Sequence, residues 1–166
     1  MIFILSLSGL FLSCTKEEYC LSDVVAYLDI GFYTWEDGVR VKKTIETFTA
    51  CGISSDSLIY DARTNIQSVE LPLSNLSDTS RFMFVFQVDM PSIPSIDRYR
   101  KYKIKDTLIV VYSRQIFFIS PVCGFGYNYE LLDAFATQNY IDSVIITNPY
   151  VYISDKGTEE NIEILF

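Results

Sequence analysis

Apolar and polar residues alternate along most of the chain, and residues typical of turns separate the alternating segments. Every second residue from Val24 to Phe32 is apolar, which places these side chains on one face of a strand. The Asp37-Gly38 pair that follows is typical of a tight hairpin turn, so residues 39–50 are expected to form the returning strand. Further strands are expected at residues 57–60, 67–73, 81–88, 106–119, 124–136, 140–148 and 161–166.

Three of these segments carry more specific expectations. Residues 81–88 (RFMFVFQV) are apolar on both faces, which predicts a central strand that is covered on both sides. Residues 106–119 are expected to form either one long strand or two strands separated near Ser113-Arg114. Residues 131–135 are the best candidate for a single turn of helix, because no segment sustains the apolar spacing of a helix over several turns.

Short strands separated by turns favour an all-β fold, namely an immunoglobulin-like β-sandwich of about eight or nine strands. The composition agrees, because 15% of the residues are aromatic and aromatic side chains favour pleated, half-buried surfaces. We expect residues 1–13 to form a signal peptide, residues 14–22 a lipidated tether, and residues 23–166 one β-sandwich domain.

The start of the chain predicts a bacterial lipoprotein. An apolar run from Ile2 to Leu12 ends in Ser13-Cys14 and is followed by polar residues, as in a signal peptide whose cysteine accepts a lipid. The run is too short to cross a bilayer core of roughly 30 Å. The alternative is a buried strand or helix with a chance cysteine, and the absence of Lys or Arg before the run departs from the usual pattern.

Charge and cysteine content limit the partners and cofactors. The net charge of −8 would repel a polyanion, so nucleic acid is not expected as a partner. If Cys14 is lipidated, Cys20, Cys51 and Cys123 remain, and an exported protein would use them as one disulfide and one buried thiol. Without histidine or a CxxC pair, zinc is not expected, and we predict neither a metal nor a cofactor.

One basic cluster stands out in this acidic chain. Arg98, Arg100, Lys101 and Lys103 fall within it, and Arg114 follows further along. These five side chains are candidates for binding lipid phosphates or an acidic partner. The alternative interpretation is an edge strand that lysines protect against aggregation.

Catalytic and metal-binding candidates are fewer. Without histidine, a Ser/His/Asp or Cys/His arrangement is impossible. A carboxylate pair such as Asp97 and Asp106 remains a candidate for glycoside hydrolysis. Asp155, Glu159 and Glu160 are candidate calcium ligands, but they lack the spacing of an EF-hand, which favours a solvated acidic turn.

Residues 112–125 read Tyr-x-Arg, three residues, then Phe-x-Ser-Pro-x-Cys-Gly-Phe, and residues 161–166 read Asn-Ile-Glu-Ile-Leu-Phe. With the lipoprotein start and the cysteine soon after it, the chain resembles the DUF6452 family of lipoproteins from Bacteroidota. The resemblance implies a β-rich fold and a Cys20–Cys123 disulfide, and it leaves Cys51 outside the pattern. It brings no established function with it.

We therefore expect a non-catalytic, membrane-anchored binding or interaction module of the bacterial cell envelope. Its expected partners are the membrane, through the lipid, and an outer-membrane protein, whereas its oligomeric state is left open. One alternative is a carbohydrate-binding module, with Trp35 and Tyr33 stacking on a sugar, although a lone Trp beside a turn more often packs. The other alternative is a carboxylate-based hydrolase. The expected location is the outer membrane, and Lys16-Glu17-Glu18 resembles an export signal of surface-exposed lipoproteins.

Overall fold

The structure is a computed structural model that describes residues 20, 25–53, 57–89, 101–153 and 159–166. Within these residues the regular elements are all strands, as the sequence predicts. They number eleven: β1 (Tyr27–Glu36), β2 (Val39–Lys42), β3 (Ile45–Gly52), β4 (Ser57–Ile66), β5 (Ser68–Pro72), β6 (Thr79–Asp89), β7 (Lys101–Ser120), β8 (Gly124–Ala136), β9 (Ser143–Ile146), β10 (Tyr150–Val151) and β11 (Ile162–Leu165).

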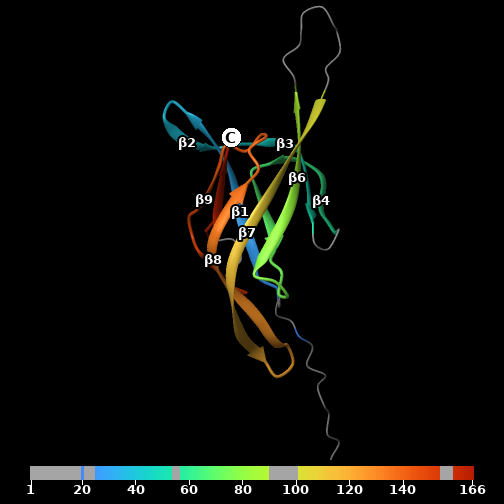
Figure 1. The fold of residues 1–166 in the computed structure, drawn as a ribbon, viewed down its shortest axis with the longest axis vertical. Coiled ribbons are helices and arrows are strands. Elements are labelled where there is room, and N and C mark those ends of the chain that lie inside the picture. Colours follow the sequence, from blue (N-terminus) through green and yellow to red (C-terminus); the bar gives the residue numbers. More distant parts are fainter. Residues whose placement is uncertain (1–19, 21–24, 54–56, 90–100, 154–158) are drawn as a thin grey trace, which may run out of the picture.

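The strands form two sheets that pack face to face, which confirms the predicted β-sandwich (Figure 1). In the first sheet the order is β2-β1-β11-β9, and β5 also pairs with β1. The second sheet has the order β10-β8-β7-β6-β3-β4. Most pairs are antiparallel, but β1 and β11 run parallel, so the last strand of the chain lies beside the first.

The strand expected over residues 39–50 is instead two strands in different sheets. Asp37 and Gly38 both have positive φ values, of 50° and 78°, which confirms the tight turn before β2. After pairing with β1 over four residues, the chain crosses at residues 43–44 and continues as β3 between β4 and β6. Because this crossing contains neither Gly nor Pro, the local sequence gives no turn signal there. This division accounts for one of the two strands that the described residues contain beyond the nine predicted, and β10, which lies outside the predicted segments, is the other.

Aromatic rings fill the core between the sheets. The ring of Phe48 in β3 lies 5.4 Å from that of Phe32 in β1, and 5.1 and 5.5 Å from those of Phe84 and Phe86 in β6. All four side chains are fully buried. Ring pairs at such separations add packing energy to the apolar burial of the individual rings, so this cluster joins the two layers.

Strand β6 is central, as predicted, but it is covered on one face. Phe82, Phe84 and Phe86 are buried, whereas Met83 and Val85 between them are only half-buried. The expectation of two covered faces was therefore wrong. The reason is that the fold has two layers, so the outer face of this sheet has no layer above it.

Strands β7 and β8 form the longest pairing of the sandwich. β7 is a single strand of 20 residues, which decides between the one-strand and two-strand alternatives. β8 occupies the predicted residues, and the helical turn expected at residues 131–135 is wrong, because these residues pair with β7. The two strands continue beyond the body of the sandwich as a projecting hairpin (Figure 1).

Candidate functional site

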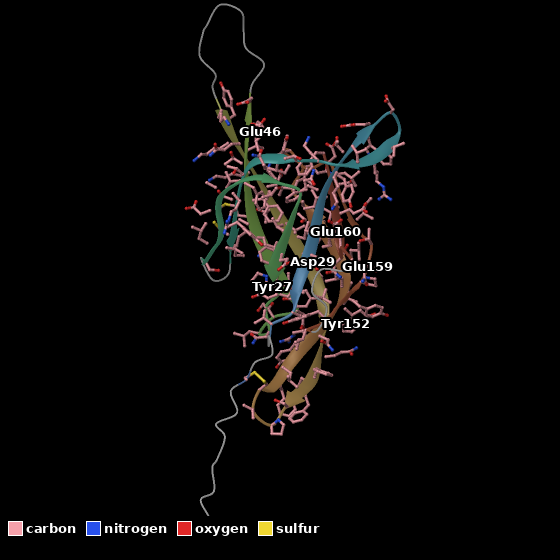
Figure 2. All side chains as sticks on the ribbon, turned by 180° about the vertical axis from the view of Figure 1, so that it is seen from behind. Tyr27, Asp29, Glu46, Tyr152, Glu159 and Glu160 are labelled. Atoms are coloured by element: carbon pink, nitrogen blue, oxygen red, sulfur yellow. A yellow bond between two sulfur atoms is a disulfide. The ribbon has the colours of Figure 1, made fainter. Side chains whose placement is uncertain are left out.

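An open groove with a volume of about 690 Å³ lies where the first sheet meets the segment before β11. Figure 2 shows Asp29 and Glu160 beside each other along β1. Four of its lining residues carry carboxylates, which makes the groove polar and predominantly acidic. The lining residues are Asp29, Tyr33, Lys42, Tyr60, Ser68, Val69, Glu70, Glu159 and Glu160.

Glu160 lies across the backbone of β1 in the middle of this groove. The Tyr33 hydroxyl donates a hydrogen bond of 2.7 Å to Glu160 Oε2, and Lys42 forms an ion pair with Glu160 Oε1. The Lys42 ammonium also sits 4.5 Å from the centre of the Tyr33 ring, within the range of a cation–π contact. A Cβ atom at Gly31 would overlap the Glu160 carboxylate, so glycine at this strand position allows the carboxylate to approach the backbone closely.

The next residue, Asn161, fixes the position of Glu160. Its backbone N–H donates to the Asp29 carbonyl at 2.9 Å, and the Asp29 N–H donates to Asn161 Oδ1 at 3.1 Å. Asn161 Nδ2 donates to the carbonyls of Asn148 and Tyr150, at 3.2 and 2.8 Å. This buried amide therefore holds the segment before β11 against β1.

Tyr60 forms the wall at the edge of the groove. Its hydroxyl donates to the Glu70 carbonyl at 3.0 Å and lies 3.1 Å from the Glu70 N–H, which donates to it. Because Tyr60 belongs to β4 and Glu70 to β5, the contact joins the two sheets along one edge. The two hydrogen bonds hold the Tyr60 side chain at the edge of the groove.

The protonation states of the central pair follow from burial and hydrogen bonding. Burial raises the pKa of Tyr33, and the hydrogen bond to Glu160 raises it further. Burial alone would lower the pKa of Lys42, but hydrogen bonds to Glu160 and Tyr33 hold that pKa above its ordinary value. Lys42 is therefore a cation and Tyr33 a neutral donor at neutral pH, and both bind the Glu160 carboxylate.

The two aromatic candidates for sugar binding have different surroundings. Tyr33 is half-buried in the groove, while Trp35, two residues further along the same face of β1, is 59% exposed. The interpretation of Trp35 as a packing residue is therefore wrong. The side chain does not line the groove, so any ligand touching both would extend along β1 toward the β1–β2 turn.

The basic residues predicted to bind together do not form one site. Arg98 and Arg100 lie outside the described residues. Lys101 is 3.7 Å from Glu46, and Lys103 is exposed near the same end of β7. Arg114 lies eleven residues beyond Lys103 on this unbroken strand, a separation of about 36 Å at the rise of a β-strand.

Arg114 has local partners instead. Its Nε donates to Asp78 at 2.7 Å and its guanidinium donates to the Asn75 carbonyl at 2.5 Å. The guanidinium also lies 6.0 Å from the centre of the Tyr127 ring. These contacts fasten the loop before β6 to the strand pair β7–β8. Toward the other end of β7, residues 101–105 pair with β6 but lie beyond the pairing with β8, which ends at Leu108; among the described strands this leaves one side as an edge, where lysines protect against aggregation.

Asp106, a candidate catalytic acid, is a buried structural residue. Its side chain is 1% exposed and accepts hydrogen bonds from the Thr137 hydroxyl and from the backbone N–H groups of Asn139, Tyr140 and Ile141. Four donors thus occupy both carboxylate oxygens. Its proposed catalytic partner, Asp97, lies outside the described residues.

Two of the three calcium candidates, Glu159 and Glu160, line the groove. Glu160 is bound to Tyr33 and Lys42 rather than lying free in a solvated turn, and Asp155 is outside the described residues. Within the described part of the chain, no three carboxylate or thiol groups lie close enough to hold a metal ion. The same part of the chain contains no helix with the length and apolar character needed to span a bilayer.

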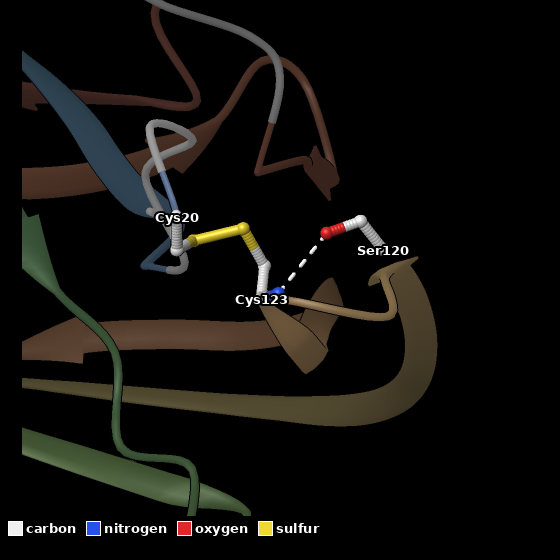
Figure 3. Close-up of a disulfide and its surroundings, with 3 residues drawn as sticks. All are labelled: Cys20, Ser120 and Cys123. Atoms are coloured by element: carbon white, nitrogen blue, oxygen red, sulfur yellow. Dashed lines mark hydrogen bonds between the residues drawn. A yellow bond between two sulfur atoms is a disulfide. The ribbon is translucent and has the colours of Figure 1, made fainter. Parts of the chain in front are cut away.

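A disulfide joins Cys20 to Cys123, which confirms the pairing implied by the family resemblance (Figure 3). The turn that carries Cys123 is itself held by a hydrogen bond of 3.0 Å from the Cys123 N–H to the Ser120 hydroxyl. Cys51 is a free thiol, as predicted, but it is half-buried rather than fully buried. The Cys20–Cys123 disulfide links the chain before β1 to the end of the β7–β8 hairpin.

Most residues of the groove were missed by sequence reasoning. Asp29, Lys42, Tyr60 and Glu70 belong to four different strands, and no spacing in the sequence links them. One available signal was Gly31, because an isolated glycine in an alternating strand marks close approach of another group.

Comparison with known proteins gives a family but no function. A family model described as a family of unknown function (DUF6452) matches residues 47–166. The chain therefore belongs to this family. Searches of curated proteins and of solved structures find no match.

Proposed function

We propose that this member of the DUF6452 family is a non-catalytic lipoprotein of the bacterial outer membrane, anchored through Cys14, that binds a ligand or protein partner in the groove around Glu160. The proposal leaves open which face of the outer membrane the domain occupies. It combines a subcellular location that the sequence predicts with a groove that the fold forms.

The observation that carries the proposal is the Cys20–Cys123 disulfide. Structural disulfides persist in oxidising compartments such as the bacterial periplasm and the cell surface. The bond begins six residues after the predicted lipidation site at Cys14. An exported chain with a short tether to the membrane is the simplest protein that contains both features.

The groove supports binding rather than a particular reaction. Its central carboxylate, Glu160, is paired with Lys42 and Tyr33, and Asp106, the described member of the proposed catalytic pair, is fully occupied by structural hydrogen bonds. The groove is lined by further polar groups, including Ser68, Glu70 and Glu159, and its acidic character suits a ligand that offers several hydrogen-bond donors.

A carbohydrate-binding module is the second candidate, and the exposure of Trp35 is the observation that favours it. Sugars bind by stacking on aromatic rings and by hydrogen bonds to carboxylates, and Trp35 and Tyr33 share one face of β1 beside an acidic groove. Titration with cell-envelope polysaccharides distinguishes the two candidates, since sugar binding would shift the fluorescence emission of Trp35.

The anchoring part of the proposal is tested by comparing wild type with Cys14→Ala and with Cys51→Ala as a matched control. We expect the mature N-terminal peptide of wild type and control to begin at Cys14 and to carry acyl chains by mass spectrometry. Two or three acyl chains make a lasting anchor, so both proteins should enter the detergent phase. A wild-type peptide without acyl chains would overturn the lipoprotein proposal.

A further inference from the structure

The hairpin tip, defined here as residues 115–127, has an apolar surface that the rest of the sandwich leaves uncovered. Strand β6 pairs with β7 only as far as Val111, and β10 pairs with β8 at Tyr129 and Glu130. Beyond these points, among the described strands, β7 and β8 pair only with each other. The tip therefore extends past the facing sheet as a two-stranded ribbon (Figure 1).

Large apolar side chains are exposed on the side of the ribbon that continues the core face. Phe118 and Phe125 are directly opposite each other in the β7–β8 register, so their side chains share a face, and their rings are 5.3 Å apart. They are 52% and 66% exposed, and Ile116 on the same face is 69% exposed. Phe117 on the other face and Val122 in the turn are also exposed.

The tip also differs from the rest of this acidic protein in charge. Residues 115–129 contain no Asp, Glu, Lys or Arg, although the whole chain carries a net charge of −8. A contiguous exposed apolar patch on a soluble domain marks an interaction site. With no charges to desolvate, this one suits an apolar environment better than a polar partner.

The disulfide places the hairpin tip close to the predicted lipidation site, and therefore close to the bilayer. Cys20 is held beside Cys123 in the tip, with the two Cα atoms 5.0 Å apart. Cys14 lies six residues earlier, and a chain of that length spans at most about 20 Å. A lipid on Cys14 would therefore hold the tip within about 20 Å of the bilayer, and Figure 2 shows the disulfide at the hairpin end of the molecule.

We propose that the hairpin tip inserts Phe118, Phe125 and Ile116 into the interfacial region of the bilayer that holds the Cys14 lipid, and so orients the domain on the membrane. This inference rests on the proposed lipidation of Cys14. The lipid provides the lasting attachment, and the tip provides a second contact that removes rotational freedom. The alternative occupant is a second copy of the chain, but the tip lies beside the segment that would carry the lipid, so the bilayer is the apolar environment within reach.

The experiment places a single indole in the tip of the lipidated, full-length protein. Phe118→Trp is made in a Trp35→Phe background, and the protein is reconstituted in phosphatidylcholine vesicles whose acyl chains carry bromine, which quenches indole fluorescence on contact. The matched control is Phe135→Trp in the same background, since Phe135 lies on β8 in the body of the sandwich and is 47% exposed.

We expect strong quenching for Phe118→Trp and little for Phe135→Trp or for Trp35 in the wild-type protein, which lies on the β1–β2 hairpin. Equal, weak quenching in all three vesicle-bound proteins would overturn the tip contact while leaving the lipid anchor intact. If the lipid anchor itself is wrong, acyl chains will be missing from the Cys14 peptide, a separate readout. Dimerisation of the lipid-free Cys14→Ala chain that Phe118→Ser abolishes would assign the tip to a second copy and also overturn the proposal.

Discussion

Replacing Asp106 by Asn should destabilise the fold strongly, although the two side chains have nearly the same shape. Asp106 Oδ1 accepts hydrogen bonds from the Thr137 hydroxyl at 2.8 Å and the Asn139 N–H at 2.9 Å. Its Oδ2 accepts from the N–H groups of Tyr140 at 2.8 Å and Ile141 at 3.1 Å. An amide in this position presents its own N–H groups to two of these four donors.

The size of the effect follows from the bonds that are lost. Two hydrogen bonds to a charged acceptor disappear, each worth about 1.5–3 kcal/mol. The two donors that made them then face the amide NH₂ group, which cannot accept a hydrogen bond. Part of this loss is offset, because the neutral amide is less costly to bury than a carboxylate. We therefore expect a decrease of about 3–5 kcal/mol in the free energy of unfolding, a large fraction of the typical total of about 5–15 kcal/mol.

Urea denaturation, followed by circular dichroism, measures this difference. Asp133→Asn is the matched control, since Asp133 is exposed on the neighbouring strand β8 and a surface substitution should change stability by less than about 0.5 kcal/mol. The midpoint for Asp106→Asn should fall with an unchanged slope. A midpoint equal to that of the control would mean that the loop at residues 137–141 does not depend on the carboxylate, and the structural role assigned to Asp106 would be refuted.

Two further predictions concern the groove and the buried tyrosines. Gly31→Ala should displace the Glu160 carboxylate from Tyr33 and Lys42 with a small loss of stability, because the overlapping group is the end of a flexible side chain; an unchanged pKa of Tyr33, followed by the NMR signals of its ring, would contradict it. Burial raises the pKa of Tyr129 from 10.0 to about 12, so its contribution is complete below pH 10 and is lost as the pH rises to about 12. Unfolding titrations across this range should show falling stability, and a constant midpoint would contradict that expectation.

The predicted elements that proved correct were those with local signals. The Asp37-Gly38 turn was predictable because both residues tolerate positive φ, and Gly124 marks the start of β8 in the same way, with a φ of 73°. The change of sheet after β2 carries no comparable signal. It depends on β3 pairing with β6 over residues far along the chain, which is a property of the tertiary fold.

The candidate site was much less predictable than the fold. The residues next to Glu160 in the sequence predict only an acidic loop. Its ion-pair partner, Lys42, is 118 positions away in the sequence, so no local pattern indicates the pair. Arg114 was grouped with the basic cluster because of its charge alone. In the structure, eleven residues of the unbroken strand β7 separate Arg114 from Lys103. Only contacts between residues near in sequence, or a glycine that marks a close approach as Gly31 does, leave a trace that a single sequence can reveal.

The length of β7 also bears on what its basic end can bind. β7 contains 20 residues, which at the rise of a β-strand span about 66 Å, and it runs from the basic end of the molecule to the hairpin tip (Figure 1). If the tip rests on the membrane, Lys101 and Lys103 lie too far from that leaflet to contact its phosphates. The proposed membrane contact would therefore favour an acidic partner, or protection of the strand edge, over lipid phosphates for these lysines.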